Sequence, residues 1–399
     1  MRIKSRNDVY HIFISIGIIF YILWKMPIVS LYCNTYIAMV ILILTIFLLI
    51  GSSYIRLNQF PQFLIVLLFF TLFELLDYYG TAKSIFLVGW SIFLDLFPLI
   101  IGYLLVRTKQ DKLIDKIVSL VVITSIITAV TTIMGLQIFP NASRELATGG
   151  ELYVSRYYAY NIGGFSFIYS LVLIHPMLIC RYKSKCKSYI AIFITIIFAL
   201  CIFKSNYTTA TLFFLISCFA YIIPDSNNKS KKRLFGVIVI ILSIVIYYRL
   251  PSILDYLSEL PIFEASSGKM SDLSNMLLGG EAIEYDTNAR MLLFKQSWEA
   301  FLSNPLLGSR FTGKSGGGHS YILDFAASYG IIGIIMLCAI YKALFNNLKR
   351  ISDNSSIMIY TSFSMVIAIA MSFVNPDLWL YNIGFVTPLV AYSVVQRTK

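Results

Sequence analysis

Charged residues are scarce in this sequence. They account for 13% of the 399 residues, whereas a soluble domain carries about 25%. Hydrophobic residues account for 58%, and the mean hydropathy is +0.77. Apolar runs of about 20 residues, long enough to cross a bilayer as a helix, recur from one end of the chain to the other. The composition therefore excludes a soluble globular enzyme and predicts an all-α polytopic membrane protein.

Cysteine and histidine are also rare, with six and three residues. The cysteines form no Cys-x-x-Cys pair, and most of them fall inside apolar runs or at the ends of such runs. We therefore expect small core residues and not a disulfide framework or a zinc site. No Asp-x-Asp pair is present to supply oxygen ligands for Mg²⁺ or Mn²⁺. We expect no metal and no cofactor.

The apolar runs predict about twelve membrane-spanning helices in a single integral membrane domain that covers residues 1–399. Clusters of lysine and arginine precede the first run and follow the fourth, sixth, eighth, tenth and twelfth. Because such clusters collect on the cytoplasmic side, both termini are predicted to be cytoplasmic. The same rule explains the net charge of +12 without a nucleic-acid partner. The predicted spans are residues 9–24, 33–50, 61–77, 84–106, 117–138, 158–180, 189–203, 208–224, 234–249, 320–345, 355–374 and 379–395.

Two polar segments, residues 139–157 and 250–319, are then predicted to be periplasmic loops. The second is long enough to have structure of its own, as functional loops do. Asp286 begins a pattern typical of a short amphipathic helix that lies over the bundle as a lid or at the lipid interface, and Asn304-Pro305 ends it. The apolar residues at helical spacing are Met291, Phe294, Trp298 and Phe301.

Three side chains on the periplasmic side are candidates for chemistry. Arg156 stands at the mouth of the sixth span, where it either binds phosphate oxygens in pairs or reaches water from among interfacial tyrosines. Arg290 is expected in the first turn of the amphipathic helix, where it either holds an anion beside free N–H groups or is simply solvated. His319 either acts as a general base or bonds to the loop backbone. Several tyrosines near the mouth either stack on sugars or form an interfacial belt, namely Tyr157, Tyr158, Tyr160 and Tyr321.

Three blocks of the sequence resemble the O-antigen polymerase and ligase superfamily of bacterial membrane glycosyltransferases. His319-Ser320-Tyr321-Ile322-Leu323, followed by Gly330-Ile331-Ile332-Gly333, is similar to the family's His-Asn-x-x-Leu and Gly-x-x-Gly pattern. Asn288-Ala289-Arg290, Trp298 and Asn304-Pro305-Leu306-Leu307-Gly308 are similar to its Arg, Trp and Pro-x-x-Gly block. Arg156 with Asn161-Ile162-Gly163-Gly164-Phe165 is similar to its earlier arginine-bearing segment. Ser320 departs from the pattern, in which asparagine is usual.

The resemblance implies a GT-C-like fold in the bacterial inner membrane. It implies a metal-independent, inverting transfer of an undecaprenyl-pyrophosphate-linked glycan onto another lipid-linked repeat unit at the periplasmic face. Arg156 and Arg290 would stabilise the leaving pyrophosphate, and His319 would deprotonate the acceptor hydroxyl. The implied substrate contacts are Tyr157, Tyr160, Asn161 and Tyr321. A chain-length regulator and a flippase are the implied protein partners.

Three other functions stay open. A ligase of the same superfamily would transfer the glycan to lipid A–core. A polysaccharide flippase or other transporter would distribute ionisable groups through the bundle and carry inverted repeats, whereas here the candidates gather on one face. A cell-wall polymerase would depend on a periplasmic carboxylate, such as Glu281 or Asp286.

Overall fold

The structure is a computed structural model. It describes most of the chain, and the statements below concern the described residues. These are residues 6–33, 35–51, 71, 85–149, 151–183, 188–223, 230, 248–260, 263, 267–280, 285–310, 316–351 and 355–398.

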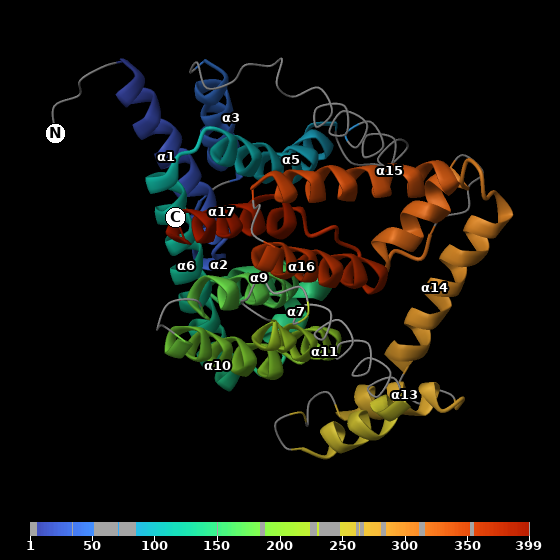
Figure 1. Ribbon diagram of the computed structural model, residues 1–399. Helices are drawn as coiled ribbons and strands as arrows, with labels where there is room; N and C mark the ends of the chain where they lie inside the picture. The colour runs from blue at the N-terminus through green and yellow to red at the C-terminus, as the bar shows by residue number, and fades with distance from the viewer. Residues whose placement is uncertain are drawn as a thin grey trace.

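Every regular element in the described part of the chain is helical (Figure 1). Short elements join the α-helices: a 3-10 turn at Cys218–Ile222, a π-helical turn at Asn382–Val386, and a helical stretch at residues 248–259. The α-helices are α1 (Arg6–Trp24), α2 (Pro27–Tyr32), α3 (Thr35–Gly51), α5 (Ile85–Arg107), α6 (Asp111–Ile138), α7 (Ala142–Thr148), α8 (Glu151–Ala159), α9 (Phe165–Lys183), α10 (Ser188–Lys204), α11 (Thr208–Ser217), α13 (Ser267–Leu277), α14 (Tyr285–Ser303), α15 (Tyr321–Ile351), α16 (Ser355–Val374) and α17 (Thr387–Thr398).

Four helices among the described residues are long and apolar enough to cross a membrane, namely α6, α9, α15 and α16. Shorter apolar helices accompany them in α1, α3, α5, α10 and α11. An all-helical fold is therefore confirmed for the described residues, and its long apolar helices are compatible with a membrane protein, whereas the count of twelve spans stays a prediction. The predicted spans 61–77 and 234–249 lie almost wholly outside the described residues.

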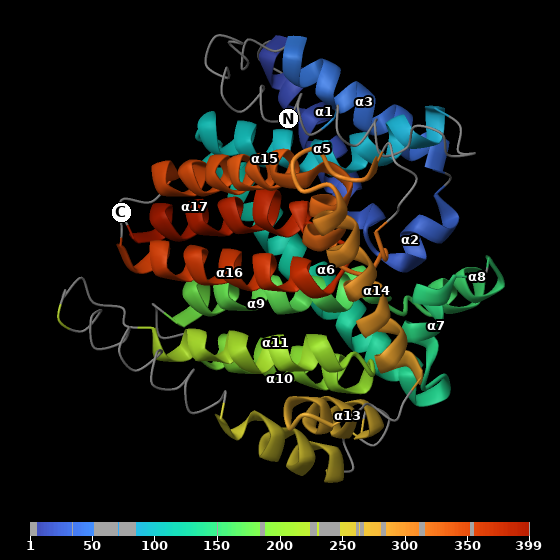
Figure 2. The ribbon, with the colours of Figure 1, turned by 90° about the vertical axis from the view of Figure 1, so that its right-hand side faces the viewer.

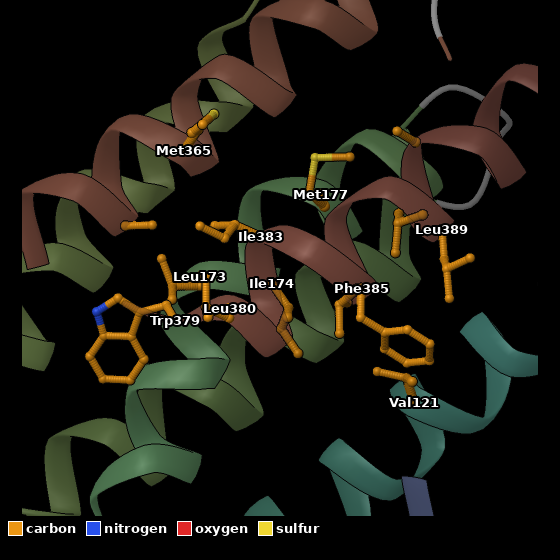
Figure 3. Close-up of a cluster of buried hydrophobic side chains, with 14 of the residues drawn as sticks. Val121, Leu173, Ile174, Met177, Met365, Trp379, Leu380, Ile383, Phe385 and Leu389 are labelled. Carbon is orange, nitrogen blue, oxygen red and sulfur yellow. The ribbon is translucent and has the colours of Figure 1, made fainter. Parts of the chain in front are cut away.

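The core of the bundle is formed around α17, which packs against α6, α9 and α16, and α9 also packs against α16 (Figure 2). Helix α9 is the most enclosed, because nearly every residue from Ile168 to Arg181 is buried. Leu173, Ile174 and Met177 of α9 meet Phe385 and Leu389 in a continuous apolar cluster (Figure 3). Helices α1 and α3 lie on one side of this core, and α10 and α11 lie on the other (Figure 1).

One end of the bundle carries α7, α8 and α14, and we call it the α14 end (Figure 2). The sixth predicted span, 158–180, differs from the structure here. Helix α8 stops at Ala159, a turn follows, and α9 begins only at Phe165. The turn needs Asn161 in the left-handed region, at φ +54°, which asparagine tolerates better than most residues.

At the opposite end of the bundle, one carboxylate forms ion pairs with two arginines. Asp115 at the start of α6 accepts from Arg181 at 3.0 Å and from Arg397 at 2.7 Å. The Arg181 side chain is only 1% exposed, so its charge depends on this partner. Ser393 also donates to Asp115 at 2.7 Å. These contacts tie α17 to α6 and α9.

Helix α14 matches the expected helix in extent, and the structure shows which of its residues are buried. Met291 and Trp298 are about half exposed, whereas Ser297 and Ala300 are buried. The side of α14 that packs against α15 therefore consists of small residues, because they let the two backbones come close. The large apolar residues point away from that contact, as expected of a helix at a lipid interface.

Helix α15 is kinked where the turn after α14 touches it. Gly330 has φ +62° and ψ −151°, and the backbone groups that the kink releases find partners in the turn. Ile331 N–H donates to the Pro305 carbonyl at 2.8 Å, and Ser309 N–H donates to the Ala327 carbonyl at 2.8 Å. The Pro-x-x-Gly and Gly-x-x-Gly segments are thus packed on each other.

Candidate functional site

Four aromatic rings pack together where α9, α11 and the segment before α17 meet at the α14 end. We call them the ring cluster: Phe165, Tyr169, Tyr207 and Trp379. Tyr169 lies at its centre, with ring centroids 4.6 Å from Phe165, 5.7 Å from Tyr207 and 5.4 Å from Trp379. The Trp379 indole is stacked on Tyr169 at an interplanar angle of 23°. In Figure 3 it lies at the margin of the apolar core, away from Met177 and Leu389.

Two arginines from separate helices act on the ring cluster. Arg144 of α7 and Arg290 of α14 both exert their positive charge on the hydroxyl of Tyr207, and both lower its pKa. Burial is the larger effect and leaves the pKa of Tyr207 above its usual range. Arg290 acts on the Tyr169 hydroxyl as well. Both guanidinium groups are half-buried, so the site is positive and only partly open to solvent.

Tyr207 is fixed by a backbone contact. Its hydroxyl donates to the Ser143 carbonyl at 2.7 Å, and Ser143 in turn donates from its own hydroxyl to the Gly163 carbonyl at 2.7 Å. Arg144 directly follows Ser143, so these two bonds hold α7 over the ring cluster. The placement of Arg144 is a result of this packing.

Several buried polar atoms around the ring cluster make no hydrogen bond within the described part of the chain. They are Asn206 Oδ1, Thr208 Oγ1 and the indole Nε1 of Trp379. Asn206 sits at φ +62°, in the left-handed region, and is 7% exposed. Leaving a buried polar atom unpaired costs about 1–3 kcal/mol. A site that keeps such atoms is typical of one that binds a polar ligand.

His319 lies immediately before α15, at the point where a capping arrangement begins that helix. The Ser320 hydroxyl accepts from Leu323 N–H at 3.1 Å, and Asp324 Oδ2 accepts from Ser320 N–H at 3.0 Å. Asparagine and serine serve equally well as N-caps, which accounts for serine at a position where the resembling family has asparagine. The half-buried imidazole of His319 makes no hydrogen bond to any residue that the structure describes.

Asn375 joins the start of α15 to the ring cluster. Its carbonyl accepts from Tyr321 N–H at 3.0 Å, while its side chain contacts the Tyr169 hydroxyl. His319, only two residues before Tyr321, is therefore held at the same end of the bundle as Arg144 and Arg290. The Tyr321 ring itself is stacked on Phe325 at 5.7 Å.

The structure places Arg290 in the second turn of α14, because the helix begins at Tyr285. The expectation that Arg290 stands in the first turn, beside free N–H groups, was wrong. Its proximity to Tyr169 and Tyr207 supplies the positioning instead.

Arg156 lies apart from these contacts, on the exposed side of α8. Its guanidinium stacks over the ring of Phe139 at 4.5 Å and lies 5.9 Å from the ring of Tyr157. Tyr160 also packs on Phe139, at 5.3 Å, and is half exposed. The structure does not bring Arg156 together with Arg290 and His319, so its phosphate-binding role stays a prediction.

Tyr157 and Asn161 serve as ties in the same region. The Tyr157 hydroxyl donates to Glu145, which joins α8 to α7 and raises the pKa of Tyr157. The Asn161 side chain donates to Thr131 Oγ1 at 3.0 Å and accepts from Ile28 N–H at 3.2 Å. Asn161 is 4% exposed, so its amide is occupied by these structural bonds.

Sequence reasoning missed Arg144 and the ring cluster. The one available signal for Arg144 was a second arginine within the 139–157 loop, in a segment with no family pattern. The cluster joins residues 165 to 379, and nothing in local spacing reveals such a long-range contact.

The sequence analysis also did not use the run from Gly308 to Ser315, which matches the phosphate-loop pattern Gly-x-x-x-x-Gly-Lys-Ser. A functional phosphate loop follows a strand and opens a helix. Here a helix precedes it, and Gly308 is buried against Ser328 of α15. The described part of the run lacks the structural context of a nucleotide site.

No group of three or more His, Cys, Asp or Glu side chains that could hold a metal ion occurs among the described residues. Neither the protein-family models nor the curated proteins compared with this chain match it.

Proposed function

We propose that the protein is a membrane glycosyltransferase that polymerises lipid-linked glycan repeat units, of the O-antigen or capsular type. The observation that carries the proposal is the pair of arginines from α7 and α14 whose charges act on Tyr207, at the same end of the bundle as a half-buried histidine before α15. A pyrophosphate leaving group needs positive charge, and a sugar acceptor needs a base.

In the proposed reaction, the glycan to be transferred is linked to undecaprenyl pyrophosphate. A hydroxyl oxygen of the acceptor sugar attacks the anomeric carbon from the face opposite the pyrophosphate. The bond between the anomeric carbon and the pyrophosphate oxygen breaks, and its electron pair leaves with the pyrophosphate. The acceptor proton passes to the imidazole of His319. The product is a longer glycan with an inverted linkage and a free lipid pyrophosphate.

Arg144 and Arg290 stabilise the negative charge that grows on the pyrophosphate. Each planar guanidinium donates two parallel hydrogen bonds to phosphate oxygens, which a lysine cannot do. Because both groups are half-buried, their attraction for phosphate is less screened than at an exposed surface. The polyprenyl chain stays in the bilayer, so we place the α14 end at the periplasmic face of the inner membrane.

The test is the surface polysaccharide of a deletion strain complemented with variants at matched membrane levels. Arg144→Ala, Arg290→Ala and His319→Ala should each give core capped by a single repeat unit. Arg249→Ala, an exposed arginine at the start of helical stretch 248–259, is the matched control and should give normal polymer. Normal polymer from Arg144→Ala and Arg290→Ala would refute the proposed function.

The same gel separates polymerase from ligase. If the deletion leaves single repeat units on the core, ligation works and polymerisation has failed. If the core carries no repeat unit while lipid-linked polymer accumulates, the protein is the ligase. Arg156→Ala then shows whether the exposed arginine of α8 adds a second anion contact, because loss of polymer is expected only in that case.

A further inference from the structure

A second feature at the α14 end is a cavity of about 270 Å³ between α1, α6, α9 and the segment that leads into α17. Buried apolar side chains, among them Ile22, Ile174 and Leu380, form part of its lining. Lys25 and Ser166 line it and are exposed, so the cavity opens at the surface. A cavity of this size has room for several water molecules or for one small ring.

The cavity wall is rich in hydroxyl and amide groups that come from two helical stripes. Thr124, Ser125 and Thr128 share one face of α6, and Ser166 and Ser170 share one face of α9. The amide of Asn382 completes the wall and accepts from the Ser170 hydroxyl at 3.1 Å. Polar stripes on two apolar helices are costly in a membrane, which indicates that they face a polar occupant.

Three polar groups of the wall have no hydrogen-bond partner within the described residues. They are the hydroxyls of Ser125 and Ser166 and the indole nitrogen of Trp379. Trp379 is 2% exposed, so its N–H is shielded from bulk water. A buried donor of this kind requires an acceptor, and the cavity is where one can be placed.

The charges of the cavity compensate each other. Lys25 and Asp377 both line it. Burial raises the pKa of Asp377, and the positive charge of Lys25 opposes that rise. The Lys25 ammonium also lies over the Tyr21 and Tyr381 rings, at 5.4 and 5.5 Å. Asp377 Oδ1 accepts from the backbone N–H of Trp379 at 2.7 Å, and a carboxylate has capacity for further donors.

We propose that this cavity binds a single uncharged sugar ring of the glycan substrate. The carboxylate of Asp377 accepts from the hydroxyls of the sugar, and Ser125, Ser166 and Trp379 supply the donors that are otherwise unpaired. The ring of Tyr381 covers the apolar face of the sugar. A phosphate fits poorly, because Asp377 repels it and the arginines lie at the ring cluster. An acyl chain fits poorly, because it leaves the polar stripes unsatisfied.

The cavity adjoins the ring cluster. Trp379 lines the cavity and stacks on Tyr169, and Ser166 directly follows Phe165. A glycan whose pyrophosphate lies at Arg144 and Arg290 therefore has a neighbouring pocket for one of its sugars. The assignment of the sugar to the substrate rests on the proposed function, whereas sugar binding itself is measured without any transfer reaction.

The experiment is saturation-transfer NMR on the purified full chain in detergent. The probes are methyl glycosides of glucose, galactose, mannose, rhamnose and N-acetylglucosamine. At least one should receive saturation from the wild type. Ser125→Leu fills the cavity and should abolish the signal. Asp377→Asn removes a charged hydrogen-bond acceptor and should weaken binding at least about tenfold. Ile127→Phe, on the exposed side of the same helix, is the control and should bind normally.

Two outcomes overturn the proposal: no transfer to any of the glycosides, or an undiminished signal in Ser125→Leu. Thermal unfolding of each variant checks that it is folded, and Ser125→Leu should melt within a few degrees of the wild type. The proposed function fails separately, when Arg144→Ala and Arg290→Ala still make polymer. Sugar binding with normal polymer in those variants would leave the cavity assignment standing and remove the polymerase.

Discussion

Gly330→Ala tests whether the turn after α14 is docked on the kink of α15. A Cβ at this position would lie 2.5 Å from the Leu306 carbonyl oxygen and 2.6 Å from that of Pro305. The backbone at φ +62° and ψ −151° adds strain of about 1–3 kcal/mol for any residue but glycine. Moving the turn away breaks the bond from Ile331 N–H to the Pro305 carbonyl, worth about 1 kcal/mol. The docked state should lose about 3 kcal/mol.

Hydrogen exchange measures this loss directly. A change of about 3 kcal/mol shifts the ratio of docked to undocked states about 150-fold, and the protection of the Ile331 and Ser309 amides should fall by about that factor. Gly279→Ala is the matched control, because Gly279 has φ +87° but no neighbour within 4 Å of a Cβ. It should leave both amides protected. Unchanged protection in Gly330→Ala would refute the docking of the turn on the kink.

The remaining predictions concern single contacts. Asp115→Asn removes the charge of the only carboxylate that Arg181 contacts among the described residues, and should lower the free energy of unfolding by about 2 kcal/mol, as measured by thermal unfolding. The control is Glu299→Gln, whose pair with Lys295 at 3.9 Å is exposed, and it should lower the free energy of unfolding by less than about 0.5 kcal/mol. Equal losses in the two variants would contradict the argument. Arg290→Lys keeps the charge but not the planar fork, so polymer should fall at least about tenfold, and full activity would mean that charge alone suffices. The bond to Glu145 raises the pKa of Tyr157, so its stabilising effect is complete below the ordinary tyrosine pKa of about 10 and is lost as pH rises through the raised pKa. Tyr157→Phe should accordingly lower the melting temperature at neutral pH and flatten its decline above about pH 10, and a melting series from pH 8 to about 11 checks both effects.

The composition and apolar runs were sufficient to predict an all-helical membrane protein, because the bilayer imposes both length and polarity on its helices. The end of α14 was also predictable, since Asn304-Pro305 follows it, whereas its start at Tyr285 precedes the predicted cap. The residues that pack on α15 were not predictable, because that contact selects Ser297 and Ala300 for their size, and size leaves no hydrophobic signature.

The candidate site was predictable only in part. Arg290 and His319 were recognised by residue type and pattern, and the structure holds both at one end of the bundle. Arg144 was missed because its position depends on Tyr207, which is distant in sequence and binds the carbonyl of Ser143. Asn161 looked like a contact for substrate, yet its amide is used in structural bonds that pattern alone cannot reveal.

The contacts of α17 and the segment before it have a consequence for synthesis of the chain. Three groups form hydrogen bonds to residues that come later in the chain. Tyr321 at the start of α15 bonds to Asn375, Ser170 in α9 bonds to Asn382, and Asp115 bonds to Arg397. Each partner follows in the chain the group that it bonds, so the earlier helices enter the membrane with these groups still unmatched. A chain truncated before Asn375 lacks all three contacts at once, so α9 and the starts of α6 and α15 lose their ties together.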